Sequence, residues 1–90
     1  MIVSISARLQ RVIKKLDKSE KKALDASLHL IIAQPKIGFL KTGDLAGTRV
    51  YKYNFNRQSM LLAYVLSLDE KHLVLIGYGS HENFYRDLKR

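Results

Sequence analysis

The chain has no cysteine and a single proline in 90 residues. Without cysteine there is no disulfide framework and no thiolate metal site, which is consistent with a reducing compartment. The longest unbroken apolar run, residues 60–66, is far shorter than the ~20 residues that span a bilayer. No basic stretch precedes an apolar segment near the start, so we expect no signal peptide. These features predict a soluble cytoplasmic protein with no segment that spans a membrane.

Acidic residues are also scarce. Eight Asp and Glu stand against sixteen Lys and Arg, which gives a formal net charge of +8. Such an excess on a small body produces a positive field that attracts polyanions. Nucleic acid is the favoured partner, with an anionic membrane surface or an acidic protein as alternatives. A hydrophobic fraction of 47% predicts an ordinary globular fold, and 90 residues make one domain, 1–90.

The first helix is predicted by an apolar stripe. The apolar residues of 5–16 recur at helical spacing and fall on one face about 100° wide. Ser4 or Ser6 can cap its start, because a serine hydroxyl accepts from the first free backbone N–H groups. Residues 2–3, ahead of it, are a possible short edge strand.

A second helix follows after a short link. Asp17 with Glu20 three residues on resembles a capping box, with Asp in place of the usual Ser or Thr. The helix ends before Pro35, because the residue preceding a proline is pushed out of the α region. The short link at Asp17 implies an antiparallel helical hairpin.

The period then changes from 3.6 to 2. After a loop at 36–48, residues 49–55 alternate, with Tyr51, Tyr53 and Phe55 on the face expected to point inward. Residues 60–66 are apolar on both faces, which is typical of a central strand. A further two-sided strand is predicted over 73–76. Three consecutive strands of this kind predict an antiparallel meander.

A short helix closes the chain. Ser80 is its expected cap, and Phe84 with Leu88 forms an i, i+4 buried pair. The predicted fold class is therefore α+β, with the helical hairpin packed on one face of the sheet. Because the hairpin cannot also cover the second face, we expect that face to be partly open and to carry Lys52 and Asn54.

Most familiar enzyme sites are excluded. The three histidines, His29, His72 and His81, have no metal-ligand spacing. Residues 77–79 begin like a dinucleotide-binding fingerprint, but the third glycine and the βαβ context are missing. There is no phosphate-binding P-loop. We therefore expect neither a metal nor a cofactor.

One short constellation remains. His81 lies in the first turn of the last helix and Tyr85 follows one turn later, while Lys52 lies on the open sheet face with Arg49 and Arg57 at the ends of its strand. An imidazole, a phenol and fixed cations are sufficient to cleave RNA without metal, by moving protons and stabilising a phosphorane. Taken singly, these residues also fit a cap neighbour, a core aromatic and solvated surface charges.

Four segments resemble the RelE/ParE superfamily of bacterial toxins. They are Leu45-Ala46-Gly47, Val50-Tyr51-Lys52, Leu62-Ala63-Tyr64 and, most specifically, residues 79–88, GSHENFYRDL. The resemblance covers nearly the whole chain and implies a RelE-like fold. In the RelE branch it implies a ribosome-dependent endonuclease acting on messenger RNA in the A site. In the ParE branch it implies an inhibitor of DNA gyrase.

The resemblance also assigns roles to residues. Lys52 resembles a lysine that stabilises the cleaved phosphate, His81 the catalytic histidine of the YafQ-type members, and Tyr85 the terminal aromatic near the scissile bond. Asn54 stands where RelE has a second lysine and is a candidate RNA contact. Leu61 stands near the place of an expected arginine, so any catalysis should depend on His81.

The same resemblance implies partners. They are a cognate antitoxin protein, messenger RNA on the ribosome, and operator DNA bound by a toxin–antitoxin complex. Two alternatives stay open: a gyrase inhibitor without nuclease activity, and a degenerate toxin that acts only within the antitoxin complex.

Overall fold

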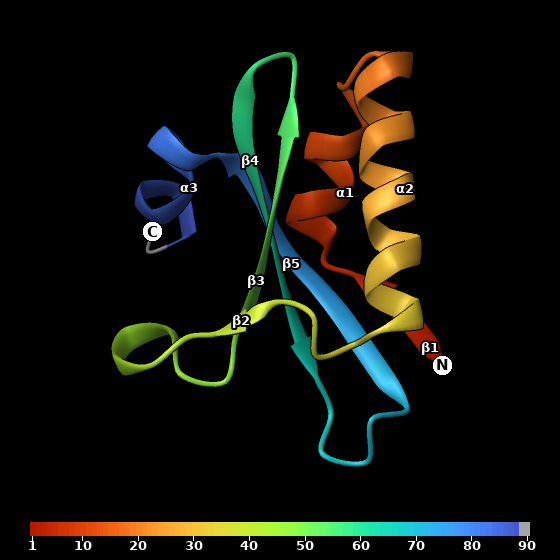
Figure 1. Ribbon diagram of the computed structural model, residues 1–90, viewed down its shortest axis with the longest axis vertical. Helices are drawn as coiled ribbons and strands as arrows, with labels where there is room; N and C mark the ends of the chain where they lie inside the picture. Colours follow the sequence, from red (N-terminus) through yellow and green to blue (C-terminus); the bar gives the residue numbers. More distant parts are fainter. Residues whose placement is uncertain (89–90) are drawn as a thin grey trace.

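A single twisted sheet carries helices on both of its faces (Figure 1). The computed structural model describes the backbone of residues 1–88 and the side chains of residues 1–84. The elements, in chain order, are β1 (Ile2–Ile5), α1 (Ala7–Lys14), α2 (Lys18–Ala33), β2 (Phe39–Leu40), a 3-10 turn (Gly43–Leu45), β3 (Arg49–Phe55), β4 (Gln58–Leu66), β5 (His72–Ser80) and α3 (His81–Leu88).

Strand β4 lies at the centre of the sheet, whose order is β1-β5-β4-β3-β2. Strands β2 to β5 pair antiparallel with their neighbours, and β1 pairs parallel with β5. Residues 60–64 of β4 are buried, because helices lie over both faces of the central strand. The predicted α+β class, meander and N-terminal strand are confirmed.

Strand β5 contains one extra residue relative to β4. Ala63 pairs with Gly77 and Tyr64 pairs with Leu75, so Ile76 is inserted between two paired positions. A bulge of this kind shifts the alternation of side chains on the strand that carries it. As a result, both Leu75 and Tyr78 face the helical hairpin, although they are three residues apart.

The two N-terminal helices begin at the caps that the sequence indicates. The backbone N–H of Leu9 donates to Ser6 Oγ at 3.2 Å, and that of Glu20 donates to Asp17 Oδ1 at 2.8 Å. Helix α1 is shorter than predicted at its start, because Ile5 pairs with Leu75 in the sheet and belongs to β1. Within residues 1–88, no helix is long and apolar enough to cross a membrane.

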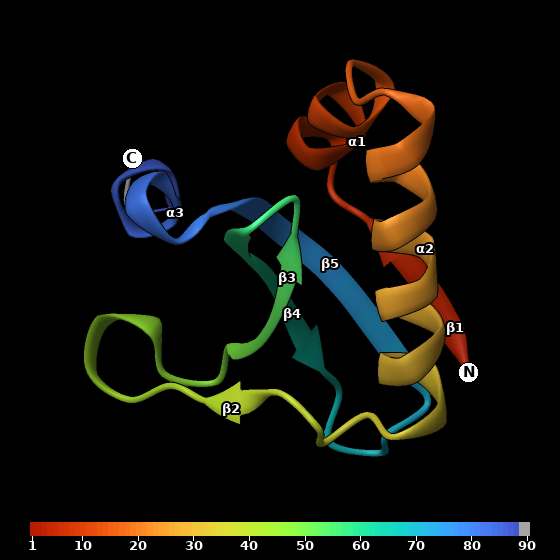
Figure 2. The ribbon, with the colours of Figure 1, turned by 45° about the horizontal axis from the view of Figure 1, so that its top comes forward.

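The main core lies between the hairpin and the sheet (Figure 2). Tyr51 and Tyr53 of β3 pack against this core, as their alternation predicts, with their rings stacked 6.2 Å apart. The buried members come from both helices and from strands β4 and β5. They are Leu9, Leu24, Ile31, Leu62, Tyr64, Leu73 and Leu75.

A smaller core lies on the opposite face. Phe84 of α3 is buried against Val50, Leu61 and Ala63. Figure 2 shows α3 on the side of the sheet away from α2. The helix packs mainly on β4 and β5 and covers Val50 of β3, whereas Lys52 and Asn54 further along β3 stay exposed on this face. Leu88, the expected partner of Phe84, has its side chain outside the described residues.

The segment at 36–48 is more ordered than the loop predicted there. Phe39 pairs with Val50 and Leu40 with Arg49, so residues 39–40 add a fifth strand at the edge of the sheet. The sequence prediction of a plain loop is wrong here. A strand of two residues is too short to show an alternation of apolar and polar side chains, so the sequence pattern could not predict it.

The Tyr64 hydroxyl fixes the connection between α2 and β2. This side chain is fully buried, donates to the carbonyl oxygen of Pro35 at 2.7 Å and accepts from the N–H of Gly38 at 3.0 Å. Gly38 has no room for a side chain, because a Cβ there would lie 2.8 Å from the hydroxyl oxygen. Burial raises the pKa of Tyr64, so the hydroxyl keeps its proton for the bond to Pro35.

We expect Tyr64→Phe to lower the free energy of unfolding by about 1–3 kcal/mol, because two buried backbone groups lose their partner. Urea denaturation measures this loss. Tyr51→Phe is the matched control: its hydroxyl makes no hydrogen bond with any described residue, so its effect should stay within about 0.5 kcal/mol. Equal effects of the two substitutions would contradict a clamping role for Tyr64.

Candidate nucleic-acid interface

Lys52 lies on the open half of the sheet. It alternates with Tyr51 and Tyr53, which face the hairpin, so it points to the opposite face and is exposed. On β4 its partner is Leu61, which is buried below Phe84. The Lys52 ammonium makes no hydrogen bond or ion pair within the described part of the chain. The exposed Lys52 lies at the border of the surface that α3 covers.

His81 lies at the same end of the sheet as Lys52. Lys52 pairs with Leu61, and Leu61 pairs with Gly79 on β5. Two strand spacings place the Cα atoms of Lys52 and Gly79 about 10 Å apart. His81 begins α3 two residues after Gly79, and its side chain is exposed. The ring and the ammonium thus belong to neighbouring parts of one surface.

The other residues predicted to contact RNA do not all lie on the same face of the sheet as Lys52. Asn54 lies two residues beyond Lys52 on the same face, is exposed, and accepts a long hydrogen bond from Ser59 Oγ at 3.5 Å. Arg57 is exposed at the tip of the β3–β4 hairpin. Arg49 pairs with the inward-facing Tyr64, so it lies on the opposite face from Lys52.

The Arg49 guanidinium forms hydrogen bonds to the backbone of the segment between α2 and β2. One of its nitrogens donates to the carbonyl oxygens of Lys36 at 3.3 Å and Gly38 at 3.0 Å. It therefore holds the segment that precedes β2, and it does not join Lys52 and His81. Tyr85 belongs to α3, but its side chain lies outside the described residues.

A polar contact under the hairpin anchors the end of β5. The hydroxyl of Tyr78 donates to Glu20 Oε2 at 2.5 Å, linking β5 to the first turn of α2. Burial raises the pKa of Tyr78, and the Glu20 carboxylate raises it further. The hydroxyl of Tyr53 is buried nearby without a hydrogen bond to any described group, and burial raises the pKa of Tyr53 too.

Sequence reasoning missed this contact. It assigned Glu20 to a capping box with Asp17. Only one half of that box is formed, in which the backbone N–H of Glu20 donates to the Asp17 carboxylate; the Glu20 carboxylate accepts from Tyr78 instead. The signal that was available is the acidic residue at the border of the helical stripe, where it is half-buried. Because Tyr78 lies 58 residues further along the chain, no local pattern links the two.

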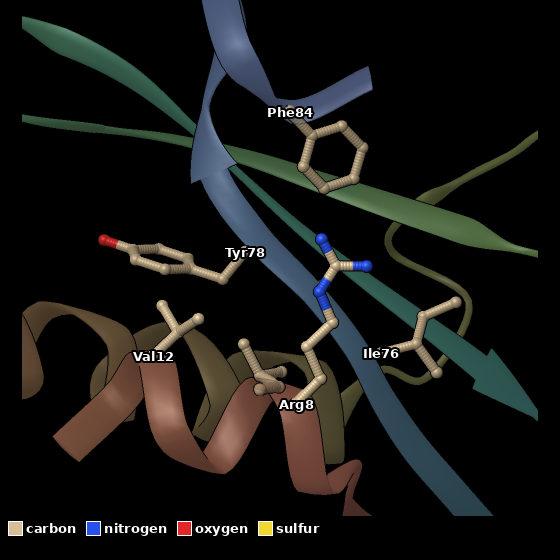
Figure 3. Close-up of a pocket in the computed structure, with 7 residues that line it drawn as sticks. Arg8, Val12, Ile76, Tyr78 and Phe84 are labelled. Atoms are coloured by element: carbon tan, nitrogen blue, oxygen red, sulfur yellow. The ribbon is translucent and has the colours of Figure 1, made fainter. Parts of the chain in front are cut away.

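A small hollow separates α1 from the end of β5 (Figure 3). Its volume is about 70 Å³, well below the 300–1,000 Å³ of a typical small-molecule site. In Figure 3 the Arg8 side chain extends from α1 between Ile76 and Phe84. A hollow of this size can take a side chain from a partner but not a nucleotide.

Comparison with known proteins identifies the family. Residues 3–89 match the family described as "ParE-like toxin of type II bacterial toxin-antitoxin system". The chain belongs to this toxin family. It is thus a RelE/ParE superfamily toxin of a type II toxin–antitoxin system, as the resemblance implied. No curated protein matches the toxin significantly by sequence.

Solved structures of RelE from E. coli share the fold of this toxin. Free RelE carrying two arginine-to-alanine substitutions matches with a TM-score of 0.75 at 16% identity, covering 98% of the toxin and 88% of that chain. The intact RelBE toxin–antitoxin complex of E. coli matches with a TM-score of 0.68 at 18% identity, covering 87% and 93%. A complex of mutant RelE from E. coli with a RelB antitoxin peptide matches with a TM-score of 0.67 at 17% identity, covering 96% of the toxin and 90% of that chain.

The Tyr78–Glu20 contact predicts a loss of stability at alkaline pH. The raised pKa means that the folded state favours the protonated phenol, so this contribution is complete below the ordinary tyrosine pKa of about 10 and is lost as the pH rises above it. We expect Tyr78→Phe to lose less stability than the wild type between pH 9 and about 11, measured by urea denaturation. Parallel pH profiles for the two proteins would contradict this.

The β3–β4 turn predicts a stabilising substitution. Asn56 and Arg57 have φ of 50° and 65°, the pattern of a two-residue type I′ turn, in which Asn-Gly is favoured. We expect Arg57→Gly to raise the free energy of unfolding by about 0.5–1 kcal/mol, because glycine adopts positive φ without strain. Arg57→Ala removes the same charge without the backbone gain. Urea denaturation measures both variants, and equal stabilities of Arg57→Gly and Arg57→Ala would contradict a strained turn.

Proposed function

We propose that this toxin is an endoribonuclease that cleaves messenger RNA on the ribosome without a metal ion and so inhibits translation. The observation that carries this proposal is the exposed pair Lys52 and His81 at one end of the sheet, beside the half of the face that α3 leaves open. A cation and an imidazole on an open, basic surface suit a phosphodiester that is part of a long polyanion.

The proposed reaction is a transfer within the RNA. A base removes the proton from the ribose 2′-hydroxyl, and the 2′-oxygen attacks the adjacent phosphorus. The bond from phosphorus to the 5′-oxygen breaks, leaving a 2′,3′-cyclic phosphate and a 5′-hydroxyl. An acid supplies the proton that the 5′-oxygen takes up, so the proton count balances. His81 is the proposed base or acid, Lys52 stabilises the charge on the phosphorane, and Tyr85 is proposed as the stacking or proton-transfer partner.

The proposal includes a cognate antitoxin. Two of the solved RelE structures are described in complex with the RelB antitoxin or a peptide of it, and the shared fold supports a partner of the same kind for this toxin. With a net charge of +8, an acidic antitoxin segment is the complementary partner. We further propose that the toxin acts in the cytoplasm and that its antitoxin complex binds operator DNA.

The decisive experiment maps messenger-RNA 5′ ends on translating ribosomes, with and without the purified toxin. We expect cuts in the A site, and we expect His81→Ala to slow them by about 10²–10⁴-fold, the usual size of general acid–base catalysis. Lys52→Ala should slow them by about 10²–10³-fold, because it removes one charge from the transition state.

His72→Ala is the matched control for this experiment. His72 is an exposed histidine at the opposite end of β5, about 27 Å from Ser80 along the strand. Its substitution should leave cleavage unchanged. A folded His81→Ala variant that cleaves at the wild-type rate would remove His81 from the mechanism.

One observation favours a second function, inhibition of DNA gyrase without cleavage. Leu61 pairs with Lys52 on the same face and is buried. From the family resemblance, a RelE toxin is expected to have an arginine near this position. The open face thus has one cation fewer than a RelE-type nuclease. Induction in cells separates the functions: early arrest of translation supports the nuclease, while DNA breaks with continued translation support the gyrase inhibitor.

A further inference from the structure

Phe39 is an aromatic side chain that the fold leaves in solvent. Its exposed fraction is 78%, although large apolar rings normally account for much of the buried surface of a small domain. It lies on β2, the two-residue strand at one edge of the sheet. Exposed apolar residues at a sheet edge favour aggregation, so a ring retained there calls for a function.

The backbone that carries this ring is held firmly on both sides. Before it, the N–H of Gly38 donates to Tyr64 and the carbonyl of Gly38 accepts from Arg49. After it, the N–H of Lys41 donates to the carbonyl of Thr48 at 2.8 Å. Several hydrogen bonds therefore fix the backbone on both sides of Phe39.

The ring shares a face with Lys52. Phe39 pairs directly with Val50, and side chains of directly paired residues point to the same side. Lys52 follows Val50 by two residues on that side, so it is the diagonal neighbour of Phe39, at about 7–8 Å. Leu40 pairs with Arg49 and points to the other face. Figure 2 shows β2 and α3 both on the side of β3 that faces away from α2.

We propose that Phe39 is a stacking platform for a base of single-stranded RNA, next to the phosphate that Lys52 binds. An aromatic ring beside a cation on a sheet face is the combination with which proteins hold single-stranded nucleic acid. The exposed Lys52 on the same face and the net charge of +8 favour RNA over an apolar protein segment. The inference rests on the proposed function and adds a binding residue to it.

The first test measures RNA affinity without cleavage. In a His81→Ala background, short single-stranded RNA is titrated at low salt against variants of Phe39. We expect both Phe39→Ala and Phe39→Leu to weaken binding by about five- to 150-fold, since each removes the ring face that stacks. Leu40→Ala, on the same strand but the opposite face, should bind as the parent does.

The second test separates the base from the backbone. On an abasic ribose-phosphate oligomer the Phe39 variants should bind as the parent does, because the phosphate contact of Lys52 is unchanged. Lys52→Ala should instead weaken binding to both oligomers. A loss for Phe39→Leu that is equal on base-bearing and abasic oligomers would overturn the stacking role.

A third test uses the absence of tryptophan from the chain. In Phe39→Trp the introduced indole is the sole such fluorophore, and we expect base-bearing RNA to quench it while the abasic oligomer does not.

Three further results would overturn the proposal. They are full RNA affinity in Phe39→Leu, no measurable affinity in the parent, and a wild-type dimer that Phe39→Leu converts to a monomer, which would assign the ring to a second copy of the chain. Because these tests measure RNA binding and not cleavage, their result is independent of whether the toxin cuts RNA. Failure of the stacking proposal can therefore be distinguished from failure of the proposed nuclease function.

Discussion

The hydroxyl of Tyr64 joins parts of the chain that would otherwise be independent. It lies on the central strand, fully buried, and it contacts both Pro35 at the end of the hairpin and Gly38 ahead of β2. With Arg49 it determines the path by which the chain leaves the helices and reaches the edge of the sheet. The position of β2 relative to β3 depends on this contact.

Unequal covering of the two sheet faces connects this packing to function. The hairpin buries one face, whereas α3 covers only part of the other, where Phe84 packs on Leu61, Ala63 and Val50. The uncovered part of β3 carries Lys52 and Asn54, exposed side by side on alternate residues. An open, basic surface of this kind suits the long polyanion of the proposed function.

Local patterns predicted much of this fold. The alternation around Lys52 was enough to place it on the open face, and the cap at Ser6 was visible in the sequence. Contacts between distant residues were not predictable, because neither the Tyr78–Glu20 bond nor the short strand at Phe39 has a periodic signal of its own. For the same reason composition could suggest a basic interface, while the separation of Arg49 from Lys52 required the sheet register.

The extra residue in β5 has a consequence for how the chain tolerates change. Ile76 moves the later part of the strand out of phase, so that Tyr78 faces the hairpin as Leu75 does. Removing Ile76 would leave Leu75 and Tyr78 two residues apart, the ordinary spacing for one face of a strand, so Tyr78 would still face Glu20. An added residue between Ile76 and Tyr78 would instead turn Tyr78 to the other face, so among functional descendants of this gene a shortened bulge should be more frequent than a lengthened one.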